Sequence, residues 1–575
     1  MLRRIFSYMK EYKKYAWLAL ICIGVEVVLE IMVPKLMADL IDIGVTNSDV
    51  PYIINKGIQM AVCAVAALIL GVGSARFSAL AGQGLGANIR KAEYEKLQSY
   101  SFFNIDHFSV SSLVTRLTSD VTNIQNAVST GMRPFGRSPV MLIFATTLAF
   151  QINSTLALVF LVALPVLAVL LIIIIINVGP RYGRMQGAVD LVNRCIEENL
   201  TAVRVVKSYV RGDYEIEKFG HVNDNLKNES EKAFGIAVLN MPAMQFVMYS
   251  TILGILLIGG RLINSGQMMI GQLTSFLSYV LLILNSLMMM SNVFLLMTRS
   301  LASAERIMKV IDEPIDITDE NARNIEVKKG EIEFNHVWFK YNETAKEYVL
   351  SDVSFHINAG QTVGIIGQTG SSKTTLIQLI PRLYDASNGE IKIDGINIKE
   401  YPVRHLRDAI SVVLQKNTLF SGSLIDNLRW GNENATLDEI KEVCSIACVD
   451  EFIDRLSGGL DAEMGQEGVN VSGGQKQRIC IARAILKKPK VLILDDSTSA
   501  VDTATEGKIR NALAKKLPDM TKIIIAQRIS SVCHADQIII MDGGRVDAIG
   551  THESLLRTNK IYQEIYESQK EGADL

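Results

Sequence analysis

A glycine-rich stretch from Gly367 to Thr375, GQTGSSKTT, combines the residue types that bind phosphate. It lies between QTVGIIG, which predicts a strand, and LIQLI, which predicts a helix, and a phosphate-binding loop requires this context. Backbone N–H groups at the start of such a helix surround phosphate oxygens. Lys373 would bring positive charge to the β- and γ-phosphates, and Thr374 a hydroxyl for Mg²⁺. The predicted ATP-binding residues of the loop are Gly367, Gln368, Thr369, Gly370, Ser371, Ser372, Lys373, Thr374 and Thr375.

A second chemically competent group is the acidic pair Asp495 and Asp496, which follows the apolar run VLIL. An acidic residue that ends a core strand opposite a phosphate-binding loop can hold Mg²⁺ through a water molecule. This role is assigned to Asp495.

Between these two groups lies the stretch VSGGQKQR, residues 471–478. Here the chain resembles the ATP-binding-cassette (ABC) transporter family, and the resemblance covers essentially the whole chain. In that family SGGQ binds the γ-phosphate of a nucleotide held by the opposite cassette; the matching residues are Ser472, Gly473, Gly474 and Gln475. The resemblance also implies that Tyr341 stacks on adenine, that Gln415 touches Mg²⁺, and that Asp502 contacts the opposite cassette.

Three positions depart from the family's pattern. Ser372 stands where the family has a glycine before the lysine. Asp496 stands where the family has the glutamate that polarises the attacking water, and Gln527 replaces the switch histidine, which contacts the γ-phosphate. Asp is shorter than Glu by one C–C bond, about 1.5 Å, and a misplacement of about 1 Å at a reacting centre can cost on the order of 10²-fold. Gln527 can donate a hydrogen bond but cannot become a cation. With the signature intact, this pattern resembles the degenerate-site subunit of heterodimeric bacterial multidrug exporters.

The elements that position these residues belong to an α/β domain, predicted for residues 329–575. After a polar, acidic linker, residues 316–328, short β-rich runs alternate with helical patterns: EIEFNHVWFKY, QTVGIIG, ISVVLQ, VLILDD, TKIIIAQR and QIIIMDG. Strands that alternate with helices favour a largely parallel core sheet.

Residues 1–315, the N-terminal part, are predicted to form an all-α transmembrane domain. Hydrophobic residues make up 49% of the chain although 21% are charged, which indicates that apolar residues are concentrated in one region. A net charge of −2 gives no basic surface for nucleic acid. Six apolar stretches are read as spans: Tyr15 to Met37, Gly57 to Ala79, Pro139 to Phe150, Thr155 to Gly179, Ala237 to Gly260 and Ile270 to Met297. The third is short and needs flanking residues such as Met132 to Ser138.

Charged residues indicate which side of the membrane each loop faces. The short loops between spans lack Lys and Arg, whereas the long ones near 83–131 and 180–235 are rich in both. By the positive-inside rule, the N-terminus, these long loops and the C-terminal half are cytoplasmic. The long loops are expected to continue the membrane helices beyond the bilayer. Val203 to Phe219 resembles a segment that docks onto a cassette, and Asn104 to Ser112 is a weaker candidate.

Inside the first predicted span, Glu26 and Glu30 are one helical turn apart and share a face. Charges at this depth are costly and usually point into a cavity. The pair is either part of a path that attracts cationic substrates or a hydrogen-bonded structural pair between helices, and the sequence leaves both interpretations open.

Together, these patterns predict half of a bacterial inner-membrane exporter of hydrophobic or amphipathic compounds. Its expected partners are membrane lipid and a second, different half-transporter with an intact catalytic glutamate and histidine. A homodimeric lipid flippase is one alternative. An ATP-gated regulatory module that does not pump is the other.

Overall fold

The computed structural model describes residues 1–343, 345–496 and 501–571. The chain divides into two compact units. The first, helical unit comprises Met1–Gln98 and Val110–Asp312, and the second comprises Ser99–Ser109 and Glu313–Leu575. The short segment Ser99–Ser109 therefore packs with the second unit, although the chain on both sides of it belongs to the first.

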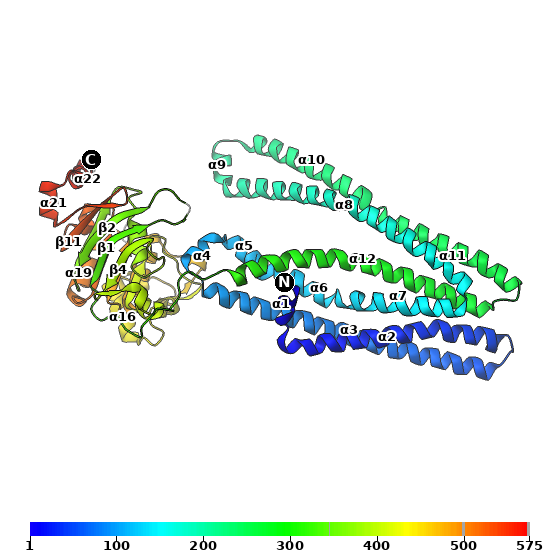
Figure 1. Ribbon diagram of the computed structural model, residues 1–575. Helices are drawn as coiled ribbons and strands as arrows, with labels where there is room; N and C mark the ends of the chain where they lie inside the picture. Colours follow the sequence, from blue (N-terminus) through cyan, green and yellow to red (C-terminus); the bar gives the residue numbers. More distant parts are fainter. Residues whose placement is uncertain (344, 497–500, 572–575) are drawn as a thin grey trace. The chain divides into compact units, whose positions relative to one another are not determined.

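Each predicted membrane span lies in a long helix of the first unit (Figure 1). These helices are α2 (Lys13–Asp39), α3 (Val50–Gln98), α7 (Met132–Ile152), α8 (Ser154–Thr201), α11 (Asn240–Asn264) and α12 (Ile270–Asp312). The third span is completed by residues 132–138, as expected. The fifth predicted span starts at Ala237, the last residue of α10 (Gly212–Ala237), and the helix is interrupted at Val238 and Leu239 before α11 begins.

Five helical stretches of the described residues are long and apolar enough to cross a membrane. They are Lys10–Val45, Val50–Gln98, Val110–Ile152, Gly212–Asn264 and Ile270–Met290. The fourth predicted span lies in α8, which is continuous over 48 residues. Several of its side chains lie outside the described part of the structure.

The helices continue past the bilayer, as the periodicity of the long loops predicts. At 1.5 Å per residue, the 49 residues of α3 extend over about 70 Å, more than twice the hydrocarbon thickness. Short helices occupy the tips of the two long loops: α4 (Phe102–His107) with α5 (Val110–Thr115), and α9 (Val203–Ser208). This unit also contains α1 (Leu2–Ser7), α6 (Val121–Ser129) and three short 3-10 or π-helical segments, Lys10–Tyr12, Leu40–Val45 and Arg116–Asp120.

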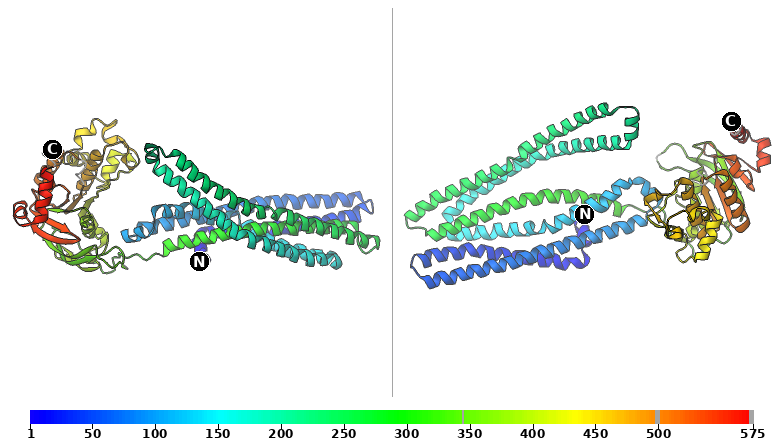
Figure 2. Two further views of the ribbon diagram at one scale, coloured as in Figure 1. Left: turned by 90° about the horizontal axis from the view of Figure 1, so that it is seen from above. Right: turned by 180° about the vertical axis from the view of Figure 1, so that it is seen from behind.

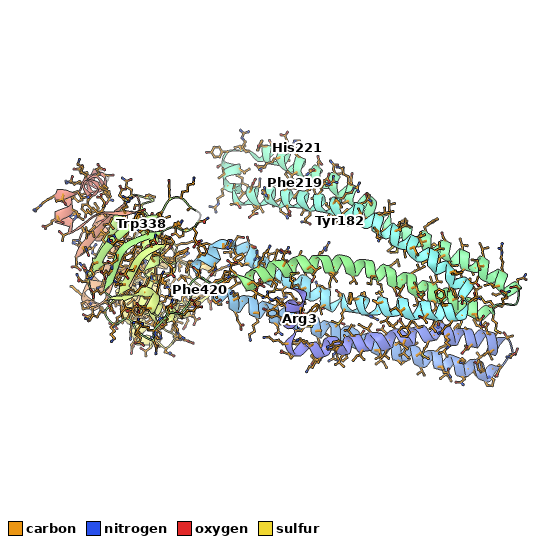
Figure 3. The ribbon with its side chains drawn as sticks, viewed as in Figure 1. Arg3, Tyr182, Phe219, His221, Trp338 and Phe420 are labelled. Atoms are coloured by element: carbon orange, nitrogen blue, oxygen red, sulfur yellow. The ribbon has the colours of Figure 1, made fainter. Side chains whose placement is uncertain are left out.

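The second long loop is a pair of antiparallel helices. Figures 1 and 2 show α8 and α10 side by side, joined by α9. Tyr182 of α8, labelled in Figure 3, lies edge-on against Phe234 of α10 with 5.9 Å between ring centroids. This contact joins the two helices just beyond the predicted end of the fourth span at Gly179.

The core of the second unit is a six-stranded sheet with the strand order β12-β11-β3-β10-β9-β6. The strands are β3 (Thr362–Gly367), β6 (Ile410–Val413), β9 (Val491–Asp495), β10 (Thr521–Ile525), β11 (Gln537–Asp542) and β12 (Arg545–Gly550). All pairs are parallel except β11 with β12, which confirms the predicted largely parallel sheet.

The first predicted strand lies elsewhere. β1 (Ile332–Phe339) belongs to a separate antiparallel sheet, ordered β2-β1-β4-β5, with β2 (Leu350–Ile357), β4 (Asn388–Ile393) and β5 (Ile396–Asn397). Its burial alternates along most of its length, which suits a sheet with one buried face.

Helices cover both faces of the parallel sheet. Along β9, Leu492 and Leu494 belong to one apolar cluster while Val491 and Ile493 belong to the other, so all five residues of the strand are buried. The flanking elements are α13 (Lys373–Leu379), α14 (Val403–Ala409), β7 (Gly422–Ser423), α15 (Leu424–Arg429), α16 (Leu437–Ile446), α17 (Asp450–Ile453), β8 (Glu463–Met464), α18 (Gly473–Leu486), α19 (Thr503–Lys516), α20 (Ile529–Val532), α21 (His552–Thr558) and α22 (Lys560–Glu571).

Candidate functional site

The site lies at the edge of the parallel sheet where β3, β9 and β10 end. A pocket of about 330 Å³ is lined there by Thr369, Gly370, Ser371, Ser372, Lys373, Thr374, Thr375, Gln415, Asp495, Asp496, Ile525 and Gln527. Residues from four separate stretches of sequence, 369–375, 415, 495–496 and 525–527, therefore meet in one pocket. They include the residues predicted to hold Mg²⁺ and to activate water, and all of the predicted phosphate-binding loop except Gly367 and Gln368.

The backbone of the loop from β3 to α13 is tightly constrained. A side chain at Gly367 would meet the carbonyl oxygen of Met541 at 2.1 Å, so only glycine fits at the end of β3. Gly370 and Ser372 both have left-handed backbone conformations, with φ of 87° and 67°. This conformation is costly for a residue with a Cβ atom. The serine at 372 therefore keeps the backbone shape that a glycine would adopt there, at some cost in stability.

Lys373 lies over the loop that precedes it. Its Nζ donates hydrogen bonds to the carbonyl oxygens of Gly367 at 2.9 Å and Gln368 at 2.8 Å, and to Ser371 Oγ at 3.2 Å. Burial lowers the pKa of Lys373, while the carboxylates of Asp495 and Asp496 act in the opposite direction. A cation is thus positioned within the pocket.

The residues predicted to hold Mg²⁺ fit a hard cation. Thr374 Oγ1 donates to Asp495 Oδ1 at 3.2 Å, and burial raises the pKa of Asp495. Among the described residues, the buried Asp495 Oδ2 has no hydrogen-bond partner. Carboxylate, hydroxyl and amide oxygens are suitable donors for Mg²⁺. The orphaned oxygen beside Thr374, with Gln415 lining the same pocket, is where this ion would be held.

The two unusual catalytic candidates contact each other. Gln527 Nε2 donates a hydrogen bond to Asp496 Oδ2 at 2.9 Å. Burial raises the pKa of Asp496, and the hydrogen bond from Gln527 acts in the opposite direction. Asp496 also has a left-handed backbone, with φ of 46°. The carboxylate that should accept a proton from water is therefore engaged by a neutral amide.

The predicted adenine-stacking residue lies beside α13. The Tyr341 hydroxyl is 3.0 Å from Thr375 Oγ1 and donates to Gln378 Oε1 at 3.2 Å. Tyr341 does not line the pocket itself, but its side chain remains 39% exposed and open to a ligand.

Sequence reasoning missed the contact that joins Tyr341 to the segment Ser99–Ser109. Tyr384 packs edge-on against Tyr341, with 5.2 Å between ring centroids, and its hydroxyl donates to Asp106 Oδ2 at 2.6 Å. Asn104 of the same segment donates to the Pro314 carbonyl at 2.8 Å. The weaker candidate, Asn104 to Ser112, thus overlaps a docked helix, α4, that begins two residues earlier. The only sequence signal that could have identified Tyr384 is that it is an aromatic residue shortly after the helix of the phosphate-binding loop.

The signature residues lie outside the pocket, at the start of α18. Ser472 caps this helix: its Oγ accepts from the Gln475 backbone N–H at 3.3 Å, and its own N–H donates to Gln475 Oε1 at 2.9 Å. Gly473 and Gly474 form the first turn. Ser472 and Gly473 are exposed, and a helix N-terminus of this kind favours an anion. The arrangement leaves the signature open to a ligand held by another molecule.

Asp502 and the two membrane glutamates complete the predicted set. Asp502 is exposed and caps α19 by accepting from the Thr505 N–H at 2.9 Å, and this hydrogen bond lowers its pKa. Glu26 and Glu30 lie far along the sequence from the ATP pocket, in the helical unit, where both line a separate cavity.

Both halves of the chain match models of known protein families. Residues 16–287 match the family model described as ABC transporter transmembrane region, and residues 350–499 match the model described as ABC transporter. The chain is 37% identical to an uncharacterized ABC transporter ATP-binding protein of Bacillus subtilis, YfiB, over 575 residues and the full length of both proteins. It is 31% identical to an ATP-dependent lipid A-core flippase of Pseudomonas putida, over 98% of this chain and 95% of the flippase.

A solved structure has the same fold. It is that of a bacterial Atm1-family ABC exporter with ATP bound, which matches with a TM-score of 0.83 at 22% identity, covering 98% of each chain.

The strained conformation of Ser372 leads to a stability prediction. Ser372→Gly should stabilise the ATP-binding unit by about 1 kcal/mol, because glycine adopts the left-handed conformation without a Cβ clash. In a domain of this size that corresponds to a rise of about 2–4 °C in melting temperature of the full chain. Thr369→Gly, an exposed loop position without positive φ, is the control and should not stabilise. An unchanged melting temperature for Ser372→Gly would show that the serine is not strained.

Proposed function

The chain belongs to the ABC transporter family, and we propose that it is one half of an ATP-driven exporter that works beside a different partner chain. Members of this family couple ATP hydrolysis to transport across a membrane. The proposal concerns the division of labour: this chain would supply one impaired ATP site of its own and an intact signature for the partner's site.

The hydrogen bond between Asp496 and Gln527 carries the proposal. A base that activates water needs a free carboxylate oxygen at the correct distance from the reacting phosphate. Asp496 is one C–C bond shorter than glutamate, about 1.5 Å, and Gln527 already donates to it. Because Gln527 stays neutral, it also supplies no cationic donor for the γ-phosphate. The pocket can therefore bind ATP but is poorly arranged to hydrolyse it.

The remaining residues of the pocket suit binding. Lys373 and the loop N–H groups would hold the phosphates. Thr374, Gln415 and Asp495 would hold Mg²⁺, which neutralises phosphate charge when it is bound. Nothing in these residues departs from what binding needs, apart from the strain at Ser372.

The intact signature supports a role in a second site. The exposed N-terminus of α18 presents the Ser472 hydroxyl and the Gly473 and Gly474 amides. A partner with its own phosphate loop, glutamate and histidine would complete a competent site against them. Two ATP molecules would then close the cassettes, and hydrolysis chiefly at that site would reset them.

The exported compounds are proposed to be hydrophobic or amphipathic, either drug-like or lipid-like. The relative named as a lipid A-core flippase supports the lipid-like alternative. A homodimeric flippase remains the second candidate because that likeness extends over nearly the whole chain. Transport into vesicles against a gradient would separate either exporter from a regulatory module that does not pump.

The proposal makes a prediction about assembly. The purified chain alone should hydrolyse ATP slowly, and turnover should rise on the order of 10²-fold when a partner with glutamate and histidine at the two altered positions is co-expressed. Steady-state ATPase activity of the chain alone and of the co-purified pair measures this. Robust turnover by the chain alone would favour the homodimeric flippase.

A further prediction concerns the two ATP sites of the assembled pair. Ser472→Arg should nearly abolish ATPase activity and transport, because losing one oriented donor typically costs about 10²–10³-fold and a bulky side chain would block closure. Asp496→Asn should leave most of both activities, since Asp496 is already a poor base. ATPase activity and vesicle transport of each variant pair give the order. Equal damage from both changes would mean that this chain houses a working hydrolytic site.

A further inference from the structure

A cavity of about 790 Å³ lies among the membrane-spanning helices α2, α3, α7 and α12. Most of its wall is apolar, formed by residues such as Val33, Ala64, Leu68, Val72, Leu281 and Leu282. Its volume falls in the range of about 300–1,000 Å³ typical of small-molecule sites. The polar part of its lining includes Glu26, Glu30 and Arg133.

The charged groups at this cavity form a balanced cluster. Glu26 Oε1 accepts hydrogen bonds from Arg133 Nη2 at 2.6 Å and from Arg137 Nη1 at 3.3 Å. Arg137 Nη2 also pairs with Glu30 Oε2 at 2.5 Å. Two carboxylates and two guanidinium groups have no net charge, which is how ionised groups are accommodated at membrane depth. The glutamates are therefore not an uncompensated negative pair that would attract any cation.

Two carboxylate oxygens of the cluster, Glu26 Oε2 and Glu30 Oε2, have no hydrogen-bond partner among the described residues, and of these Glu30 Oε2 still has its ion pair with Arg137. The Glu26 side chain is only 3% exposed, and its Oε2 has no hydrogen-bond partner among the described residues. A buried carboxylate oxygen without a donor is costly. Its neighbour Arg133 is 39% exposed, and a guanidinium carries five N–H donors, so it can bind an anion while it holds Glu26. The cavity thus offers an acceptor and a donor side by side.

We propose that this cavity binds a zwitterionic amphiphile that carries a protonated amine and a phosphate. The ammonium group donates to Glu26 Oε2, the phosphate accepts from Arg133, and the apolar chain lies along α3 and α12. A neutral ligand in a neutral site leaves no net charge in a medium of low dielectric, whereas a monocation or a monoanion does. The inference rests on the proposed export function, for which it names the substrate class.

Glycine at position 71 supports a close fit between α3 and the cluster. A Cβ atom there would lie 3.2 Å from Glu26 Oε1 and 3.3 Å from Arg133 Nη2. The backbone of α3 therefore approaches the ion pair closely, and a larger residue would crowd the charged end of the cavity without changing its charge.

Direct binding tests the inference without ATP or a partner chain. The full chain, purified in an uncharged maltoside detergent, is titrated with three fluorescent probes of equal chain length. They are a phosphatidylethanolamine, an anionic phosphatidylglycerol and a cationic alkylammonium. The wild-type chain should bind the phosphatidylethanolamine most tightly. Because no hydrolysis is measured, failure of the heterodimer proposal would leave this result unaffected.

Charge variants should change the preference among probes rather than weaken all binding. Glu26→Gln makes the cluster positive and should weaken phosphatidylethanolamine binding on the order of tenfold to a hundredfold, while phosphatidylglycerol becomes the preferred probe. Arg133→Gln makes it negative and should favour the cationic probe. Glu231→Gln, at an exposed position on α10, is the matched control and should change nothing.

Two results would overturn the inference. One is a wild-type chain that binds the three probes equally well. The other is a parallel loss of all three affinities in folded Glu26→Gln and Arg133→Gln chains, which would make the cluster purely structural. If one variant does not fold, as judged by its melting temperature, the inference is still tested by the other variant and by the order of the wild-type affinities for the three probes.

Discussion

The parallel pairing of β3, β10 and β9 is the constraint on which the ATP pocket depends. Ile525 of β10 lies opposite Ile365 on one side and Asp495 on the other, so the three strands end at the same edge. Helices bury both faces of this sheet, which fixes the strands to each other. The phosphate loop and the acidic pair therefore meet although 121 residues separate Thr374 from Asp495.

The same constraint explains why the departures from the family pattern matter. The Asp496 N–H donates to the Ile525 carbonyl at 3.0 Å, which holds the backbone of this residue against β10. Gln527 follows two residues after Ile525 and reaches Asp496 from the neighbouring strand end. A carboxylate fixed in this way cannot move to make up for its shorter side chain. In contrast, Ser472 caps the exposed start of α18, which does not line this pocket.

The strands and the loop could be predicted because local patterns determine them: apolar runs bounded by glycine, and a lysine and threonine at a fixed distance. Contacts between distant segments could not. Arg133 and Arg137 are more than 100 residues from Glu26 in the sequence. Nothing in the sequence around either arginine indicates that it pairs with this glutamate. Tyr384 and Asp106 are a similar case. The left-handed backbone at Ser372 could not be predicted for a different reason, because a serine does not itself indicate a positive φ.

Restoring the family residues tests most directly whether the Asp496–Gln527 pair impairs this site. The double variant Asp496→Glu with Gln527→His should raise the ATP turnover of the chain alone on the order of tenfold to a hundredfold, because the longer carboxylate reaches the water position and the histidine can become the cationic donor that glutamine cannot. Each single variant serves as a control, and ATP binding is measured alongside. Unchanged turnover in a folded double variant that still binds ATP would contradict the account.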